Sequence, residues 1–337
     1  MAMLSRDLGV DLGTMFTRIA EGSQIVLSEP TVVAVLVEEQ KMVEYGQSAL
    51  NLMGRVKEDI EVTRPLRNGV VAYYEYTHKF LQNMIERVVG KLRLFKPQVM
   101  ITHPYDITSV ERRAVHEAAL EVLGRGANVL MVPQTLSAAL SIDLPIGTPS
   151  GNMVIIMGGG CTQVAVLAMN DTVSGITLRE GGMDLDEAIM NYIRRKYGLI
   201  ISPTYAEQIK LRIGAAVPLD EEKSMDLQGQ DQVTGLPRPL SLTTNEVVEA
   251  LEDPLDRVFE SIRVVLEKTP PELASDIIDR GIALCGGGAL LSGIDKLMTQ
   301  KLGIPTYVVD DATDQVALGA IRAIELYPIL ERNLTRF

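Results

Sequence analysis

Three glycine corners beside apolar, strand-like segments constrain the fold of this 337-residue chain most strongly. The corners at residues 11–14 ("DLGT") and 158–160 ("GGG") each stand between two short apolar segments, which predicts a strand, a tight turn and a returning strand. The third, at residues 286–288, predicts a strand that leads into a helix. A single corner of this kind is usually only a hairpin turn. Three together are what a nucleotide held between two related lobes requires, because each turn presents backbone N–H groups to phosphate oxygens.

The segments between the corners predict strands alternating with helices, and therefore an α/β fold. Thr108 and Glu111 have the spacing of a capping box, and Pro203 suits the first turn of a helix. Helices are predicted at residues 77–92, 109–123, 184–198, 203–214 and 255–268, a buried strand at 97–104, and a hairpin or loop at 228–242.

Composition limits the class of protein. With 46% apolar residues, a chain of this length is expected to form two lobes or domains. Its net charge of -12 disfavours a nucleic-acid partner. Cys161 and Cys285 lie beside glycine runs in apolar segments, which indicates buried, reduced thiols in an intracellular protein. The sequence shows neither a signal peptide nor a membrane span, so we expect a soluble protein that is at most peripheral to a membrane.

Several polar residues near the corners have two interpretations each. Asp11 could orient metal-bound water beside a phosphate, or bond its own turn backbone. Thr14 and Thr162 could donate hydroxyls to phosphates, or reflect strand propensity alone. Glu207 and Lys210 could reach a ribose and base, or form an exposed i,i+3 ion pair.

An apolar pair in a basic segment suggests contact with a membrane. Leu94 and Phe95 follow an amphipathic helix, and Lys91, Arg93 and Lys96 surround them. An apolar tip ringed by basic side chains suits insertion into an anionic lipid surface, at about 1 kcal/mol per nearby basic residue. The alternative is that the pair folds back onto its own domain.

Motifs in the same order along the whole chain resemble those of the actin superfamily, specifically the bacterial MreB/Mbl family. They include "RDLGVDLGT", "SEPTVVAV", "RPLRNGVVA", "DEAIMNYIRRKYGL", "VTGLPRPL", "GIALCGGGALLSGID" and "VALGAIRAIE". The resemblance implies an actin-like (ribonuclease H-like) two-lobe fold, with four subdomains around an interlobe nucleotide cleft. Lobe I is expected at residues 1–144 plus 314–337, with subdomain IB at about 33–75. Lobe II is expected at 145–313, with subdomain IIB at about 183–245.

The resemblance also implies a function. Members of the family assemble head to tail into paired protofilaments on the inner face of the cell membrane, where they guide cell-wall synthesis. The expected partners are further copies of the chain, the membrane surface, and cell-wall elongation proteins or paralogues. The expected ligands are ATP or ADP with Mg²⁺, and the expected location is cytoplasmic and peripheral to the membrane.

Carried over by position, the resemblance assigns individual residues to the nucleotide and to the membrane. Leu94 and Phe95 fall at the membrane-inserting loop, and Asp11 at the metal and the reacting phosphate. The expected nucleotide-binding residues are Thr14, Met15 and Phe16; Gly158, Gly159, Gly160 and Thr162; Glu207, Gln208, Ile209 and Lys210; and Gly286, Gly287, Gly288 and Ala289.

Departures from the family pattern cluster at the phosphate end of the site. Ile156 stands where relatives carry an aspartate that steadies the metal's water shell. Met15 and Phe16 replace smaller or more polar residues, so their bulk is expected to intrude on the γ-phosphate. Pro133 and Gln134 stand where relatives carry glutamates, in the strand-to-helix corner that positions the attacking water. Glutamine can orient water, as it does in eukaryotic actin, but it is a poorer base.

Cys161 and Gln163 replace a threonine and an acidic residue around the same turn. The residues on the adenosine side of the nucleotide site are therefore expected to match the family pattern. Those that hold the metal and carry out hydrolysis are expected to depart from it. Losing one of two metal-directing carboxylates is expected to weaken Mg-nucleotide binding by about 1–3 kcal/mol. We expect a divergent paralogue that is at most a weak ATPase, with Gln134 and Asp11 as the candidate catalytic residues.

Three other functions are alternatives to this interpretation. A sugar kinase of the same superfold needs a carboxylate base facing an acceptor sugar and usually a longer chain, and this sequence shows neither. A nicotinamide dehydrogenase needs G-x-G-x-x-G after its first strand, whereas "DLGTMFT" has one glycine. A nucleotide-independent scaffold that copolymerises with a competent paralogue stays open.

Overall fold

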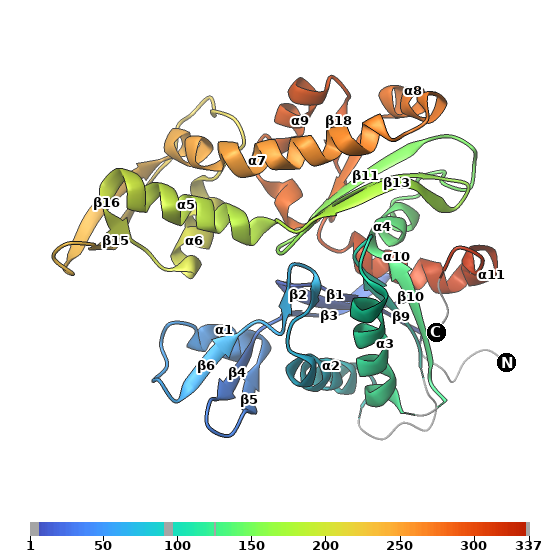
Figure 1. The fold of residues 1–337 in the computed structure, drawn as a ribbon, viewed down its shortest axis with the longest axis horizontal. Helices are drawn as coiled ribbons and strands as arrows, with labels where there is room; N and C mark the ends of the chain where they lie inside the picture. The colour runs from blue at the N-terminus through green and yellow to red at the C-terminus, as the bar shows by residue number, and fades with distance from the viewer. Residues whose placement is uncertain (1–6, 91–96, 125, 335–337) are drawn as a thin grey trace.

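The computed structural model describes residues 7–90, 97–124 and 126–334. Two five-stranded mixed sheets lie at the centres of two lobes (Figure 1). The sheet of lobe I has the order β10-β9-β1-β2-β3, and the sheet of lobe II has the order β13-β12-β11-β17-β18. In each, three consecutive strands form an antiparallel meander, and the first of the three begins a parallel run of three strands. The shared topology confirms the expected α/β fold with two related lobes.

The elements of lobe I surround its sheet. The strands are β1 (Asp7–Leu12), β2 (Phe16–Glu21), β3 (Gln24–Pro30), β9 (Gln98–His103) and β10 (Asn128–Pro133). The helices are α2 (Tyr74–Val89), α3 (Ser109–Leu123), α4 (Gln134–Ser141), α10 (Gln315–Glu325) and α11 (Tyr327–Leu330). A small sheet of β4 (Val33–Leu36), β5 (Lys41–Tyr45) and β6 (Ile60–Thr63) carries α1 (Gly46–Leu52), and β7 (Leu66–Arg67) pairs with β8 (Val70–Val71).

Lobe II is built in the same way. Its strands are β11 (Asn152–Met157), β12 (Thr162–Ala168), β13 (Asp171–Leu178), β17 (Ile282–Cys285) and β18 (Thr306–Val308). Its helices are α5 (Gly182–Tyr197), α6 (Pro203–Ile213), α7 (Thr244–Glu267), α8 (Pro271–Arg280), the 3₁₀ helix η1 (Gly287–Leu290) and α9 (Ile294–Leu302). A small sheet contains β14 (Leu199–Ile200), β15 (Ser224–Asp231) and β16 (Pro237–Thr243).

Most predicted elements are present, and two of them differ most in their boundaries. The predicted helix at 77–92 is α2, which ends at Val89 because Gly90 has a left-handed φ of 79°. The helix predicted at 255–268 is α7, which begins eleven residues earlier at Thr244 and contains Pro254. The hairpin expected at 228–242 is formed by β15 and β16.

Helices α4 and α10 lie between the two sheets (Figure 1). A cluster of buried apolar residues joins the lobes here, with Ile156 and Ala165 of lobe II packed in the same cluster as Leu136 and Ala320 of lobe I. The two helices approach so closely that a Cβ on Gly319 of α10 would stand 1.7 Å from the carbonyl oxygen of Ser137 in α4. The chain crosses between lobes along these helices, from α4 to β11 and from β18 to α10.

No helix within the described ranges is both long and apolar enough to cross a lipid bilayer.

Candidate functional site

The first two glycine corners are closed by backbone hydrogen bonds. In the β1–β2 corner, the Gly13 N–H donates to the carbonyl of Phe16 (3.2 Å), and in the β11–β12 corner the Gly158 N–H donates to that of Cys161 (2.9 Å). The carbonyl of Gly158 in turn accepts from the N–H of Gly182 (2.9 Å), at the start of α5. The second corner is thus fixed to the first turn of the helix that leads into the rest of lobe II.

The two corners touch each other across the lobes. A Cβ on Gly159 would stand 2.0 Å from Cγ of Met15, and a Cβ on Gly160 would stand 2.5 Å from Oγ1 of Thr14. Side chains of the first corner therefore rest directly on the backbone of the second. Glycine is required at both positions for this approach.

The two bulky residues of the first corner differ in position. Met15 fills the space against Gly159, as expected from its size. Phe16 lies on β2 with 36% of its surface exposed, and the guanidinium of Arg18 lies 5.2 Å from the centre of its ring. Of these two bulky residues, Met15 alone stands between the corners, so the bulk expected from both comes from one.

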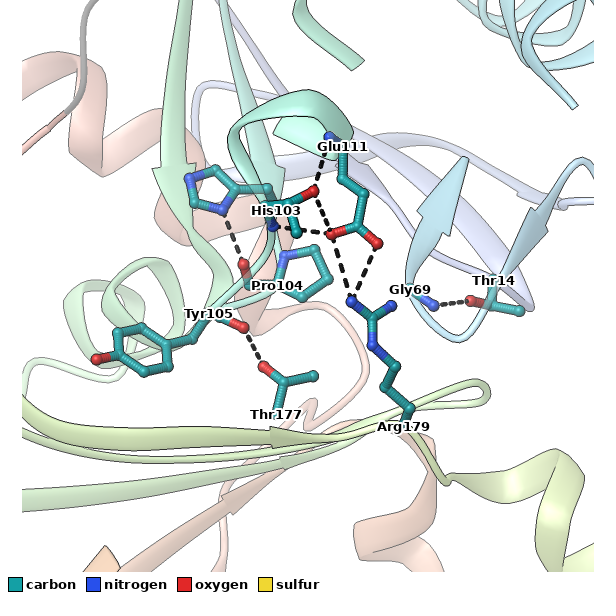
Figure 2. Close-up of polar contacts among 9 residues, drawn as sticks. Thr14, Gly69, His103, Pro104, Tyr105, Glu111, Thr177 and Arg179 are labelled. Atoms are coloured by element: carbon teal, nitrogen blue, oxygen red, sulfur yellow. Dashed lines mark hydrogen bonds and ion pairs between the residues drawn. The ribbon is translucent and has the colours of Figure 1, made fainter. Parts of the chain in front are cut away.

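Both threonines expected at phosphates have protein partners. The hydroxyl oxygen of Thr14 accepts a hydrogen bond from the N–H of Gly69 (2.9 Å), in the β7–β8 turn (Figure 2). That bond leaves the hydroxyl proton available for a further acceptor. The hydroxyl of Thr162 donates to the carbonyl of Glu180 (2.9 Å), so its proton is already engaged.

Asp11 is buried and bonded to side chains rather than to its own backbone. Its Oδ1 accepts from Oγ1 of Thr102 (2.9 Å) and from Nε2 of Gln134 (2.8 Å). Burial raises the pKa of the Asp11 carboxyl above its usual value, while the nearby charge of Arg18 and these two hydrogen bonds act in the opposite direction. The two candidate catalytic residues are therefore in direct contact.

Gln134 continues this contact into lobe II. Its Oε1 accepts a hydrogen bond from Nε2 of Gln163 on β12. The Oε1 of Gln163 accepts in turn from the backbone N–H of Tyr105 (2.8 Å) in the β9–α3 loop. Asp11, Gln134 and Gln163 are each at least 93% buried, so this chain of hydrogen bonds is shielded from water.

Ile156 stands at the end of β11, where the family pattern has a carboxylate. It pairs with Gln163 in the antiparallel register and with Cys285 in the parallel one, and 4% of its surface is exposed. Its side chain belongs to the apolar cluster between the lobes. Over the described ranges, no group of three or more His, Cys, Asp or Glu side chains could hold a metal ion. A magnesium site with two carboxylates does not fit here, because Asp11 has no acidic counterpart in lobe II.

The third glycine corner packs against the end of β11. Gly286 has a left-handed φ of 86°, and a Cβ there would stand 2.4 Å from the carbonyl oxygen of Met157. A Cβ on Gly288 would stand 2.7 Å from Cβ of Met157. Gly287 faces open space, whereas Ala289 is buried in the core of lobe II. Gly287 is thus the member of this corner with room for a ligand.

On α6, Lys210 does not pair with Glu207. Its Nζ donates to the carbonyl of Gly182 (2.6 Å) and forms an ion pair with Oδ1 of Asp186 (2.8 Å). Burial raises the pKa of Asp186 to about 6, although the charge of Lys210 lowers it. The expected alternative of an exposed i,i+3 pair is therefore wrong, since Lys210 bonds to the start of α5.

The other candidate residues of α6 have different surroundings. Ile209 is fully buried in the core of lobe II, so its side chain cannot contact a ligand, while Glu207 and Gln208 are half-buried. The guanidinium of Arg64 in lobe I donates to the carbonyls of Thr14 and Met15, each at 3.3 Å. Burial lowers the pKa of Arg64, and the carboxylates of Glu207 and Asp186 oppose this.

Sequence reasoning missed four residues of this site. They are Arg64, Thr102, Tyr105 and Asp186. Arg64 lies 49 and 50 residues from its partners Met15 and Thr14, and Thr102 lies 91 residues from Asp11. No local sequence pattern predicts contacts over such separations. The membrane candidates Leu94 and Phe95 lie outside the described residues.

Comparison with known proteins identifies relatives over nearly the whole chain. The family profile described as MreB/Mbl protein matches residues 5–332. The cell shape-determining protein MreB of Escherichia coli (strain K12) is 40% identical over 331 residues, covering 96% of this chain and 94% of that protein. The cell shape-determining protein Mbl of Bacillus subtilis (strain 168) is 40% identical over 318 residues, covering 94% and 95%.

Solved structures agree with these relatives. MreB5 of Spiroplasma citri bound to ADP has a TM-score of 0.91 and 30% identity, over 98% of this chain and 99% of that one. The same protein bound to AMPPNP gives the same values. The MamK double helical filament, with a TM-score of 0.80 and 21% identity, supports the fold alone. The expected actin-like fold is confirmed, and with the profile match and the 40% identities it leads to one assignment: this chain belongs to the MreB/Mbl family.

Proposed function

We propose that this chain assembles head to tail into actin-like filaments, arranged as paired protofilaments, that determine cell shape by organising cell-wall synthesis. Family membership supports this, because the relatives at 40% identity are named cell shape-determining proteins. The filaments lie in the cytoplasm against the inner face of the cell membrane. Their partners are further copies of the chain, paralogues and cell-wall elongation proteins.

The proposed nucleotide site lies between lobe I (residues 1–144 and 314–337) and lobe II (residues 145–313). Subdomain IB, at about 33–75, contains the small sheet of β4, β5 and β6, and subdomain IIB, at about 183–245, contains that of β14, β15 and β16. The structures of MreB5 from Spiroplasma citri with ADP and AMPPNP support an adenine nucleotide as the ligand.

Within that site, the adenosine would lie by the η1 corner and α6. The backbone of Gly287 faces open space, and the side chains of Glu207 and Gln208 are only half-buried. The phosphates would lie between the β1–β2 and β11–β12 corners once the side chain of Met15 has moved from Gly159. Methionine has three rotatable bonds, so its side chain can move away without a shift of the backbone.

One observation carries the proposal of weak hydrolysis: Asp11 and Gln134 bond to each other, while the facing position in lobe II is the buried Ile156. A bound Mg²⁺ would neutralise charge on the phosphates. Asp11 is the carboxylate available to hold its water shell. Nucleotide binding should therefore depend weakly on Mg²⁺, and turnover should be slow or undetectable.

Four experiments on the purified chain and one variant of it test the proposal. Adenine nucleotide should remain bound after gel filtration, turnover of Mg-ATP by polymerised protein should lie well below that of the E. coli relative, and electron microscopy should show filaments. Gly287→Ala should weaken nucleotide binding without changing Tm, because its Cβ would meet no protein atom within 4 Å. A relative-like rate contradicts the weak-ATPase proposal. Filaments that form equally well in protein stripped of nucleotide would instead favour the nucleotide-independent scaffold.

The membrane proposal is tested separately. The chain should cosediment with vesicles that contain anionic phospholipid, and Leu94→Ser with Phe95→Ser should abolish this. Vesicles of neutral phospholipid are the control, because the flanking basic residues favour the anionic surface. Equal sedimentation of the variant would contradict the assignment of this pair to the membrane.

A further inference from the structure

Gln163 belongs to lobe II, but both the oxygen and the nitrogen of its side-chain amide form hydrogen bonds with residues of lobe I. Its Oε1 accepts from the N–H of Tyr105 (2.8 Å), and its Nε2 donates to Oε1 of Gln134. It is 1% exposed and lies on β12, directly after the second glycine corner. This side chain therefore reaches across the boundary between the lobes beside the proposed phosphate site.

The chemistry at the two ends fixes the orientation of both amides. A backbone N–H can only donate, so Oε1 of Gln163 must face Tyr105 and its Nε2 must face Gln134. Oε1 of Gln134 then accepts from Gln163, and Nε2 of Gln134 faces Asp11, whose carboxylate oxygen accepts at 2.8 Å. The orientation of an amide side chain is usually assigned from its hydrogen-bond partners. Here the Tyr105 N–H, which only donates, and the Asp11 carboxylate, which accepts, require the same orientation of both glutamine amides.

This orientation engages the group that Gln134 needs for hydrolysis. To orient an attacking water, a glutamine must accept a hydrogen bond from it through the amide oxygen, its side chain's acceptor. One of the two lone pairs of that oxygen already accepts from Gln163, and the hydrogen bonds at both the oxygen and the nitrogen of the amide prevent it from turning toward a water. We infer that Gln163 is a positioning residue that holds the Gln134 amide against Asp11 and thereby restrains ATP hydrolysis. This inference rests on the proposed nucleotide site.

Neighbouring contacts hold the lobes together independently of Gln134. The hydroxyl of Thr177 on β13 donates to the carbonyl of Tyr105, and the guanidinium of Arg179 pairs with the carboxylate of Glu111 (3.0 Å) at the start of α3 (Figure 2). A change at Gln163 therefore frees Gln134 without removing these contacts between the β9–α3 loop and lobe II.

Gln163→Met tests the inference, since methionine has a similar length and flexibility but no N–H donor. We expect kcat for ATP to rise about tenfold, which corresponds to about 1.4 kcal/mol, with KM within twofold of the unsubstituted protein. Thr177→Val is the matched control: it removes a neighbouring hydrogen bond between the lobes and leaves Gln134 untouched, so its kcat should not change. In a Gln134→Leu background, Gln163→Met should have no effect on kcat.

A second measurement needs no nucleotide. Hydrogen exchange at the Tyr105 amide should accelerate in Gln163→Met and stay unchanged in Thr177→Val, because only the first variant removes its acceptor. An unchanged exchange rate in Gln163→Met would show that this contact does not exist in solution, and would overturn the inference.

The outcomes separate the two proposals. If the unsubstituted chain binds no nucleotide, the proposed function fails and the inference fails with it. If the chain binds nucleotide but Gln163→Met turns over ATP at an unchanged rate, only the inference fails. An equal rise in kcat in Thr177→Val would assign the effect to looser packing of the lobes and would also overturn it.

Discussion

Met15 of lobe I lies against the backbone of Gly159 in lobe II, so closely that a Cβ at Gly159 would stand 2.0 Å from Met15 Cγ. The thioether side chain occupies the space between the two glycine corners. In the proposed nucleotide site, a phosphate would therefore enter only after this side chain has moved.

Gly159→Ala should destabilise the protein. The added methyl would collide with both Cγ (2.0 Å) and Cβ (2.7 Å) of Met15, and overpacking of this kind costs about 1–3 kcal/mol. Urea unfolding measures the loss. Gly287→Ala, with open space around its Cβ, should stay within about 0.5 kcal/mol of the unsubstituted chain. Met15→Ala removes Cγ but keeps Cβ, so it should restore part of the stability in the Gly159→Ala background, and a purely additive double variant would exclude the collision as the cause.

Met15→Ala should tighten nucleotide binding. If the side chain must leave Gly159 before a phosphate enters, its displacement costs on the order of one buried methylene group, about 0.8 kcal/mol, or roughly fourfold in Kd for ADP. Isothermal titration calorimetry measures this. Met169→Ala, at an exposed methionine in the β12–β13 turn, is the control. Weaker binding by Met15→Ala would mean that the methionine contacts the ligand instead of obstructing it.

Ile156→Asp should lower stability in the absence of ligand. The carboxylate would be buried in an apolar cluster with no described basic partner, at a cost of about 3 kcal/mol, whereas Ile156→Val should cost about 1 kcal/mol. Thermal unfolding with and without Mg-ADP measures both. The aspartate variant should recover more Tm on addition of Mg-ADP than the unsubstituted chain does, because it regains a metal-directing carboxylate. Equal recovery would show that position 156 does not face the metal.

Asp186 should make stability depend on pH. Its pKa is raised from 3.8 to about 6 in the folded protein, mainly by burial, so the folded chain binds the proton more tightly than the unfolded chain does. The resulting contribution of Asp186 to the free energy of unfolding is fully present below about pH 4 and is lost as the pH rises through about 6. A pKa difference of about 2 corresponds to about 3 kcal/mol.

The isosteric variant Asp186→Asn isolates that contribution. The stability of the unsubstituted chain relative to Asp186→Asn, from urea unfolding, should fall between pH 4 and pH 6.5. A constant difference across this range would mean that Lys210, 2.8 Å away, keeps the carboxylate ionised throughout.

Local signals in the sequence predicted much of the fold. The capping box of Thr108 and Glu111 is present with both of its hydrogen bonds. The predicted helix at 255–268 begins directly after Pro254, whereas α7 contains this proline, although a proline inside a helix costs about 3 kcal/mol. The helix continues through it because it begins at its own capping box, Thr243 with Glu246, and packs apolar residues along its whole length into lobe II.

The site was less predictable because its decisive contacts are long-range. The first glycine corner singled out Asp11, and the resemblance to the family drew attention to Gln134 and Ile156. They could not show that Gln134 bonds to Asp11 across 123 residues, or that Gln163 reaches it across 29. Likewise, the spacing of Glu207 and Lys210 suggested a pair, but tertiary packing brings Lys210 to Asp186. Side-chain partners depend on where whole elements meet, which periodicity does not specify.

The close crossing of α4 and α10 ties together the two helices of lobe I that flank the chain's passage through lobe II. A glycine backbone pressed against the carbonyl of Ser137 leaves these helices no room to slide past each other at that point. The chain enters lobe II directly after α4 and returns to lobe I directly before α10. Both connections to lobe II therefore start from one rigid pair of helices, and any rotation of lobe II against lobe I would pivot next to that pair.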